Sequence, residues 1–218
     1  MVPQESVSRQ RISACLIVKN EEVRLPDCLR SLSGNVDEII IADTGSTDTT
    51  RDLTRDIGCT LHDLPWEHDF SKARNHALSY ATHDWILSID ADERLLTPEL
   101  LHRTIDNSTA STGGYFVDVE SPALRNDGVS DFYHTALLRL FRNDKRIRFY
   151  GNVHEQVADT ILSAGFTIER SAIRLFHHGY ALSSEEMREK QLRNLHLLHT
   201  TLASSPFDTY ALLQRGKT

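Results

Sequence analysis

Three carboxylates follow an apolar run near the middle of the chain. The run covers residues 85–89, and Asp90, Asp92 and Glu93 come at its end. If the strand direction persists, Asp90 and Asp92 point the same way, and their charges repel unless a cation lies between them. A hard divalent ion, Mg²⁺ or Mn²⁺, prefers such oxygen ligands and keeps positions open for a substrate phosphate. An isolated pair of this kind would more often open a solvated loop, so the interpretation depends on the surrounding residues.

Two earlier apolar runs, residues 12–18 and 36–42, also end in polar clusters. The polar residues that follow them include Asn20, Glu21, Asp43, Ser46 and Asp48. Asp43 can accept hydrogen bonds from the N–H or O–H groups of a base or a ribose. The alternative is that Asp43 and Asp48 only cap the turn, and this alternative is stronger for Asp48.

Four residues farther along the chain are also candidates for ligand binding or catalysis. Arg74 lies near the start of an expected helix, from which its guanidinium can reach a diphosphate or a base. His154 or Glu155 could act as a general base, although such a pair is usually structural. His178 follows His177 and could contact a metal or a phosphate, but the pair lacks the spacing of a zinc motif.

The elements that position these residues follow a strand-then-helix order. Three such units and the acidic strand predict an α/β, doubly wound and mostly parallel sheet. The polar clusters then share the carboxyl edge of the sheet, where open α/β sheets bind ligands. The second half predicts antiparallel additions up to residue 182. Residues 183–218 predict a helical extension that begins a helical repeat and breaks off within it.

Composition limits the classes of function. The chain has 218 residues, 39% of them hydrophobic, and a formal net charge of -7, which argues against a nucleic-acid surface. Its three cysteines lie in apolar patterns and are expected to be reduced, as in a cytoplasmic protein. We find no signal peptide and no apolar run of the roughly 20 residues that a membrane span needs.

Six short motifs, in this order, resemble family 2 glycosyltransferases with the glycosyltransferase A fold. The closest similarity is to bacterial members with tetratricopeptide-like helices after the catalytic domain, and it runs from about Ile12 to Leu202. The motifs are Leu16-Ile17-Val18-Lys19-Asn20-Glu21-Glu22, Asp43-Thr44-Gly45-Ser46-Thr47-Asp48, Asp69-Phe70-Ser71-Lys72-Ala73-Arg74-Asn75, Ile89-Asp90-Ala91-Asp92-Glu93, Gly151-Asn152-Val153-His154-Glu155 and His178-Gly179-Tyr180.

The resemblance implies an inverting transfer of a sugar from a nucleoside diphosphate sugar, with uridine diphosphate as the expected carrier. In that picture Asn20, Glu21 and Asp43 hold the nucleoside, within a substrate-binding set that also includes Ser46, Asp48 and Arg74. Asp90 reaches the ribose or the metal, Asp92 binds Mg²⁺ or Mn²⁺, and His178 completes the metal or diphosphate site. Glu155 is the first candidate for the base and His154 the second, whereas the family often uses an acidic pair there.

Two other functions compete with this hypothesis. One is a catalytically idle sugar-nucleotide fold that docks a protein partner through its helical tail; the intact pair of Asp90 and Asp92 argues against it. The other is a nucleotidyltransferase, which usually has a glycine-rich basic loop where this chain has the acidic residues 18–22. The acceptor could be a glycan, a lipid, a small molecule or a protein, and the tail could also self-associate.

Overall fold

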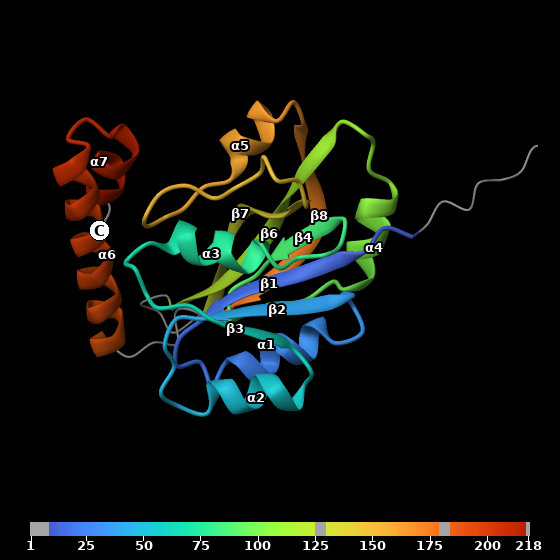
Figure 1. Cartoon of the computed structure of the whole chain (residues 1–218), viewed down its shortest axis with the longest axis horizontal. Coiled ribbons are helices and arrows are strands. Elements are labelled where there is room, and N and C mark those ends of the chain that lie inside the picture. The colour runs from blue at the N-terminus through green and yellow to red at the C-terminus, as the bar shows by residue number, and fades with distance from the viewer. Residues whose placement is uncertain (1–8, 125–129, 179–183, 217–218) are drawn as a thin grey trace, which may run out of the picture.

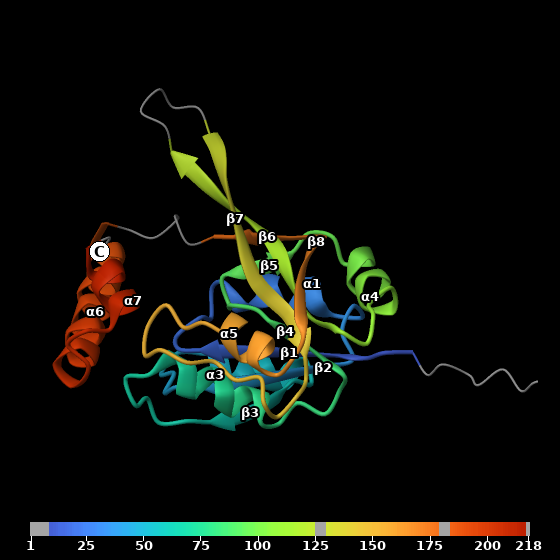
Figure 2. The same ribbon diagram turned by 90° about the horizontal axis from the view of Figure 1, so that it is seen from above.

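The computed structural model describes residues 9–124, 130–178 and 184–216. Eight strands form one sheet in the order β3-β2-β1-β4-β7-β6-β8-β5 (Figures 1 and 2). Four of the seven neighbouring strand pairs are parallel, namely β3-β2, β2-β1, β1-β4 and β6-β8. The mostly parallel α/β sheet expected from the sequence is therefore confirmed.

The first half of the chain alternates strands and helices. Its elements are β1 Ile12–Val18, α1 Leu25–Leu32, β2 Glu38–Asp43, α2 Thr50–Asp56, β3 Thr60–Asp63, α3 Phe70–Leu78 and β4 Trp85–Ser88. The near-continuous apolar sequence of β1 is typical of a strand that is covered on both faces, and six of its seven residues are buried. The carboxyl ends of β1, β2 and β4 consequently meet at one edge of the sheet.

The second half adds antiparallel strands next to β4. Its elements are β5 Glu93–Leu95, α4 Glu99–Asp106, β6 Thr112–Leu124, β7 Ser130–Arg142, α5 Ala158–Ser163 and β8 Thr167–His177. The sequence predicts strands over residues 114–120 and 135–141, and β6 and β7 extend beyond both ranges. We did not predict β5, α5 or β8. In Figure 2, the β6–β7 hairpin projects well beyond the rest of the sheet.

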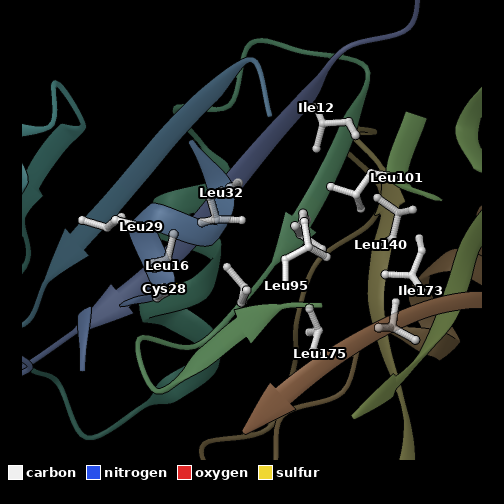
Figure 3. Close-up of a cluster of buried hydrophobic side chains, with 14 of the residues drawn as sticks. Ile12, Leu16, Cys28, Leu29, Leu32, Leu95, Leu101, Leu140, Ile173 and Leu175 are labelled. Carbon is white, nitrogen blue, oxygen red and sulfur yellow. The ribbon is translucent and has the colours of Figure 1, made fainter. Parts of the chain in front are cut away.

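Helices cover both faces of the sheet, as a doubly wound fold requires. One apolar cluster packs α1 and α4 against the sheet and includes Leu29, Leu101, Leu140 and Ile173 (Figure 3). A second cluster packs α3 and α5 on the opposite face. Fully burying one such aliphatic side chain stabilises the fold by about 1.5–3 kcal/mol, so these layers hold the sheet edge in place.

The chain ends in two helices, α6 Ser184–Ser204 and α7 Thr209–Arg215, which stand beside the sheet domain in Figure 1. The sequence predicts an apolar stripe on the first of these helices, formed by Met187, Leu192, Leu195, Leu198 and Leu202. Leu198 and Leu202 are buried and Leu195 is partly buried, but Leu192 is exposed and Leu197 is buried in its place. The side chain of Met187 lies outside the described residues, as does the predicted boundary between residues 182 and 183. None of the helices in the described part of the chain combines the length and apolar composition that a membrane span needs.

Candidate functional site

A cavity of about 780 Å³ opens at the carboxyl ends of β1 and β4. Its walls come from the polar turns after these strands, from the β6–β7 hairpin, from the loop that precedes α5 and from the two C-terminal helices. The predicted site residues that line it are Glu21, Arg74, Asp90, Asp92, His154 and Glu155. Asn20, Asp43, Ser46, Asp48 and His178 are not among its lining residues.

Asp90 is neutralised by two buried arginines. Its Oδ1 accepts a hydrogen bond of 2.8 Å from Arg74, and its Oδ2 accepts one of 2.7 Å from Arg139. Burial alone would raise the pKa of Asp90, but the two guanidinium groups outweigh it and hold that pKa well below its ordinary value. Strand β4 ends at Ser88, so Asp90 lies in the turn that follows the strand, where both of its carboxylate oxygens are paired with arginine.

Arg139 reaches the site because β7 carries an extra residue. The register between β6 and β7 shifts after Tyr115, which faces Leu140, while the next residue, Phe116, faces Leu138. Such a bulge redirects the side chain of the residue left without a partner. The guanidinium of Arg139 thereby donates both to Asp90 and, at 2.7 Å, to Glu93, whose side chain is only 1% exposed. Nothing in the sequence signalled this arginine.

Asp92 faces His177 rather than His178. Its Oδ2 lies 3.1 Å from Nε2 of His177, and the pairing of Glu93 with His177 fixes this register between β5 and β8. Burial would lower the pKa of His177, but the hydrogen bond and charge of Asp92 raise it. The imidazole of His178 packs on Phe176 instead, so the geometry favours His177 at the place where we expected His178. Gly179 and Tyr180 lie outside the described residues.

Glu21 brings a further carboxylate towards Asp92. The pKa of Glu21 is raised to about 7, mainly by burial and then by the negative charge of Asp92, against the lowering effect of Arg24. Its Oε2 is buried and accepts no hydrogen bond from the described residues, and a guanidinium nitrogen of Arg24 lies 3.7 Å from it as an ion pair. Carboxylate oxygens are the ligands that Mg²⁺ and Mn²⁺ prefer, and His177 offers a nitrogen beside Asp92. The excess of negative charge around Asp92 therefore fits a divalent cation.

We expect Glu21→Gln to raise the free energy of unfolding at pH 8 by roughly 1–2 kcal/mol and to leave it unchanged near pH 4. A carboxyl with a raised pKa keeps its proton in the folded state after the unfolded chain has released it. Stability is therefore lost as the pH rises from about 4.5 to about 7. The expected change is smaller than the full pKa shift of Glu21 would give, because its side chain is 25% exposed and solvent screens its charge.

Urea unfolding without metal ions at both pH values measures this effect. Glu189→Gln, on the exposed surface of α6, is the matched control and should change stability by less than about 0.5 kcal/mol at either pH. If Glu21→Gln changes stability equally at pH 4 and pH 8, the interpretation of Glu21 is wrong.

Glu155 is held inside the cavity by Arg74. The Nε of Arg74 donates a hydrogen bond of 2.5 Å to Glu155, whose side chain is 12% exposed. The loop that carries Glu155 is anchored on α3, where Asn75 exchanges two hydrogen bonds, of 2.8 and 2.9 Å, with the backbone of Phe149. His154 has a positive φ of 55°, and its backbone oxygen accepts a hydrogen bond from the C-terminal helix α7. Arg74 thus positions Glu155 and Asp90 relative to each other.

The loop after β2 is fastened to the loop after β1. Oδ1 of Asp43 accepts hydrogen bonds of 2.7 Å from the backbone of Gly45 and of Ser46. The backbone N–H of Asn20 donates to Oγ of Ser46, while its side chain accepts from Thr47. Asp43 therefore caps its turn through Oδ1. Its Oδ2 is buried, accepts no hydrogen bond from the described residues and lies 3.6 Å from the guanidinium of Arg51.

Asp48 shows the capping geometry that we considered as its alternative. Its two carboxylate oxygens accept hydrogen bonds from the backbone of Thr50, at 3.0 Å, and of Glu22, at 3.1 Å. Burial would raise the pKa of Asp48, but these hydrogen bonds outweigh it and lower that pKa. In this arrangement Asp48 links the two loops at the edge of the sheet.

A second group of possible metal ligands lies elsewhere on the sheet. The ligand atoms of Asp118, Glu120 and His134 lie within 4.8 Å of one another. Alternate residues of a strand face opposite ways, and Val119 of the same strand lines the cavity. This group therefore lies on the other face of the sheet, where Glu120 already forms an ion pair with Arg174. We assign it no part in the cavity.

Comparison with known proteins identifies relatives over most of the chain. The family model for glycosyl transferase family 2 matches residues 13–162. A TPR repeat-containing protein of Synechococcus elongatus is 34% identical over 215 residues, which are 94% of this chain and 51% of that protein. The SPbeta prophage-derived glycosyltransferase SunS of Bacillus subtilis is 32% identical over 201 residues, which are 89% of this chain and 46% of SunS. This chain thus spans about half the length of these curated relatives.

Solved structures share the fold at low sequence identity. The mannosyltransferase PcManGT of Pyrobaculum calidifontis, in complex with GDP-Man and Mn²⁺, matches with a TM-score of 0.61 and 19% identity, over 93% of this chain and 66% of that one. Residues 1–349 of S. aureus TarS, in complex with UDP, match with a TM-score of 0.57 and 17% identity, over 88% and 65% of the two chains. The expected glycosyltransferase A fold is therefore confirmed.

Proposed function

This chain belongs to glycosyl transferase family 2, and from that premise we propose that it transfers a sugar from a uridine diphosphate sugar to an acceptor hydroxyl, with inversion at the anomeric carbon. The observation that supports the proposal is the cavity itself, because Asp92 and Glu155 both line it. Residues 1–182 then form the catalytic domain, and residues 183–218 a helical extension of it.

The donor diphosphate would lie beside the acidic turn after β4. Asp92 and His177, whose side chains lie 3.1 Å apart, would hold a divalent ion, and Lys19 also lines the cavity as a further cation. The bound ion would neutralise the charge that develops on the departing diphosphate, as a Lewis acid does. S. aureus TarS is known in complex with UDP and with UDP-GlcNAc, which supports uridine as the nucleotide. PcManGT binds GDP-Man, so guanosine is the nucleotide to compare.

Glu155 would act as the base on the acceptor side. The acceptor oxygen attacks the anomeric carbon while the bond from that carbon to the diphosphate breaks, and the acceptor proton passes to a carboxylate oxygen of Glu155. Arg74 orients that carboxylate through its hydrogen bond of 2.5 Å. In this picture Arg74 and Asp90 are positioning residues, because their charged groups already bind each other.

Calorimetric titration with UDP, with and without Mn²⁺, tests the donor site. We expect Mn²⁺ to be required for tight binding and Asp92→Asn to weaken it by roughly 10- to 100-fold, because the ion would lose its carboxylate. The same titration with GDP shows whether the site prefers uridine to guanosine. Asp52→Asn, an exposed acid on α2, is the matched control and should bind UDP as the native chain does.

Two outcomes would count against this assignment. Binding of UDP that is indifferent to both Mn²⁺ and Asp92→Asn would remove the metal from the proposal. If neither UDP nor GDP binds to the folded chain, the transferase proposal fails, and a sugar-nucleotide fold without activity becomes the better account.

A further inference from the structure

The C-terminal helices form one wall of the cavity that contains Glu155. Arg193 and Asn194 of α6 and Tyr210 of α7 line it. Oη of Tyr210 donates a hydrogen bond of 3.0 Å to the backbone oxygen of His154 and accepts one of 3.0 Å from Gln156. These contacts join the tail to the residues on both sides of Glu155, and Figure 1 shows the tail standing beside that loop. The helical extension is therefore part of the site.

An apolar cluster fixes this wall in position. Three leucines of α6 pack with Val153 of the loop that carries Glu155, namely Leu197, Leu198 and Leu202. Trp66 and Phe70 pack against this cluster. The rings of Trp66 and Phe70 are 4.8 Å apart. Since Trp66 and Phe70 also line the cavity, they offer an apolar surface to a ligand beside the polar residues of α6.

Arg193 presents a positive charge to the cavity. Its guanidinium lies 5.3 Å from the centre of the Phe70 ring, which orients it. Within the described ranges we find no carboxylate paired with it, and burial lowers its pKa. Because Arg193 lines the cavity and its charge has no carboxylate partner among the described residues, an anionic group of a bound ligand can pair with it.

Asn194, the next residue on α6, presents a hydrogen-bond acceptor. Its Oδ1 is buried and has no hydrogen-bond partner among the residues that the structure describes. Leaving a buried polar atom unpaired costs about 1–3 kcal/mol, so a hydroxyl of a bound molecule would relieve that cost. Arg193 and Asn194 together suit a molecule that has an anionic group and a hydroxyl close to each other.

We propose that Arg193 and Asn194 form an acceptor subsite for a molecule that carries a carboxylate or a phosphate near the hydroxyl to be glycosylated. This inference rests on the proposed function, in which Glu155 takes the proton of that hydroxyl. The chain has a net charge of -7 and would repel an anionic acceptor in general. Arg193 supplies the local attraction that such an acceptor needs at the entrance.

Binding of matched probes to the chain loaded with UDP and Mn²⁺ tests the subsite. Glucuronate is compared with glucose, and glycerol phosphate with glycerol, using the fluorescence of Trp66, which lines the cavity. We expect the native chain to bind at least one anionic probe about tenfold or more tightly than its neutral counterpart, because hydrogen bonds to charged groups are the stronger ones. The preferred pair then distinguishes a carboxylate from a phosphate.

Arg193→Gln should abolish this preference without changing the affinity for UDP, and Arg193→Lys should retain part of it. Arg188→Gln, an exposed arginine on the same helix, is the control and should behave as the native chain. The subsite is overturned if charged and neutral probes bind alike, if no probe binds, or if Arg193→Gln has no effect. A native chain that fails to bind UDP overturns the proposed function instead.

Discussion

Glu155→Gln is expected to lower kcat by about 10²- to 10⁴-fold, because the acceptor proton then has no base to receive it. The amide can still accept the hydrogen bond that Arg74 gives to Glu155, so the loop should keep its place. UDP affinity should therefore stay close to that of the native chain. Release of UDP from the sugar nucleotide, measured at saturating donor, reports the rate, and calorimetry reports the affinity.

His154→Ala distinguishes the two candidate bases. Both residues line the cavity, but the side chain of Glu155 is only 12% exposed, whereas His154 is exposed and holds the tail through its backbone oxygen. We expect His154→Ala to keep most of the activity, since that backbone oxygen remains. A loss of kcat confined to His154→Ala, with Glu155→Gln fully active, would transfer the role of base to His154.

The first half of the fold could be predicted from the sequence, because there the apolar runs and the polar residues that follow them indicate the same arrangement. Residues 12–18 are almost uniformly apolar, so they had to be a strand covered on both faces, and β1 has the predicted bounds. The polar residues after β1 and β4 had to meet, because parallel strands share one carboxyl edge. For this reason we expected the clusters at Asn20, Asp43 and Asp90 in one crevice. The cavity is lined by Asp90, together with Glu21 and Asp92, whereas Asn20 and Asp43 are not among its lining residues.

The parts that we missed depend on register, which composition does not reveal. His177 and His178 are neighbours on the chain and face opposite sides of the sheet, so only the pairing of β5 with β8 decides which imidazole meets Asp92. Arg139 enters through a bulge that no local pattern marks. Strand β8 was overlooked because it carries charged residues and is buried mainly towards its end, as Ile173 and Leu175 show.

Arg74→Met is expected to destabilise the fold by about 3–5 kcal/mol at pH 7, because removal of one partner leaves buried charges uncompensated. Arg74 is 7% exposed and pairs with Asp90 and Glu155, and it also donates to Ser88 at 3.1 Å. Methionine keeps most of the volume, so the effect is electrostatic. Arg139 would still face Asp90 but would leave Glu155 without a cation.

Chemical unfolding measures the free energy of unfolding of Arg74→Met and of Arg146→Met. The comparison tests whether the loss of an ion-paired arginine costs more when that arginine is buried. Arg146 also binds a carboxylate, Asp144, but its side chain is 61% exposed, so its loss should cost no more than about 1 kcal/mol. Arg74 holds the pKa of Asp90 down, so part of the stability it supplies disappears as acid protonates that carboxylate, and the difference between Arg74→Met and the native chain should shrink at low pH. Equal losses for the two variants at pH 7 would show that the buried network does not hold the site together.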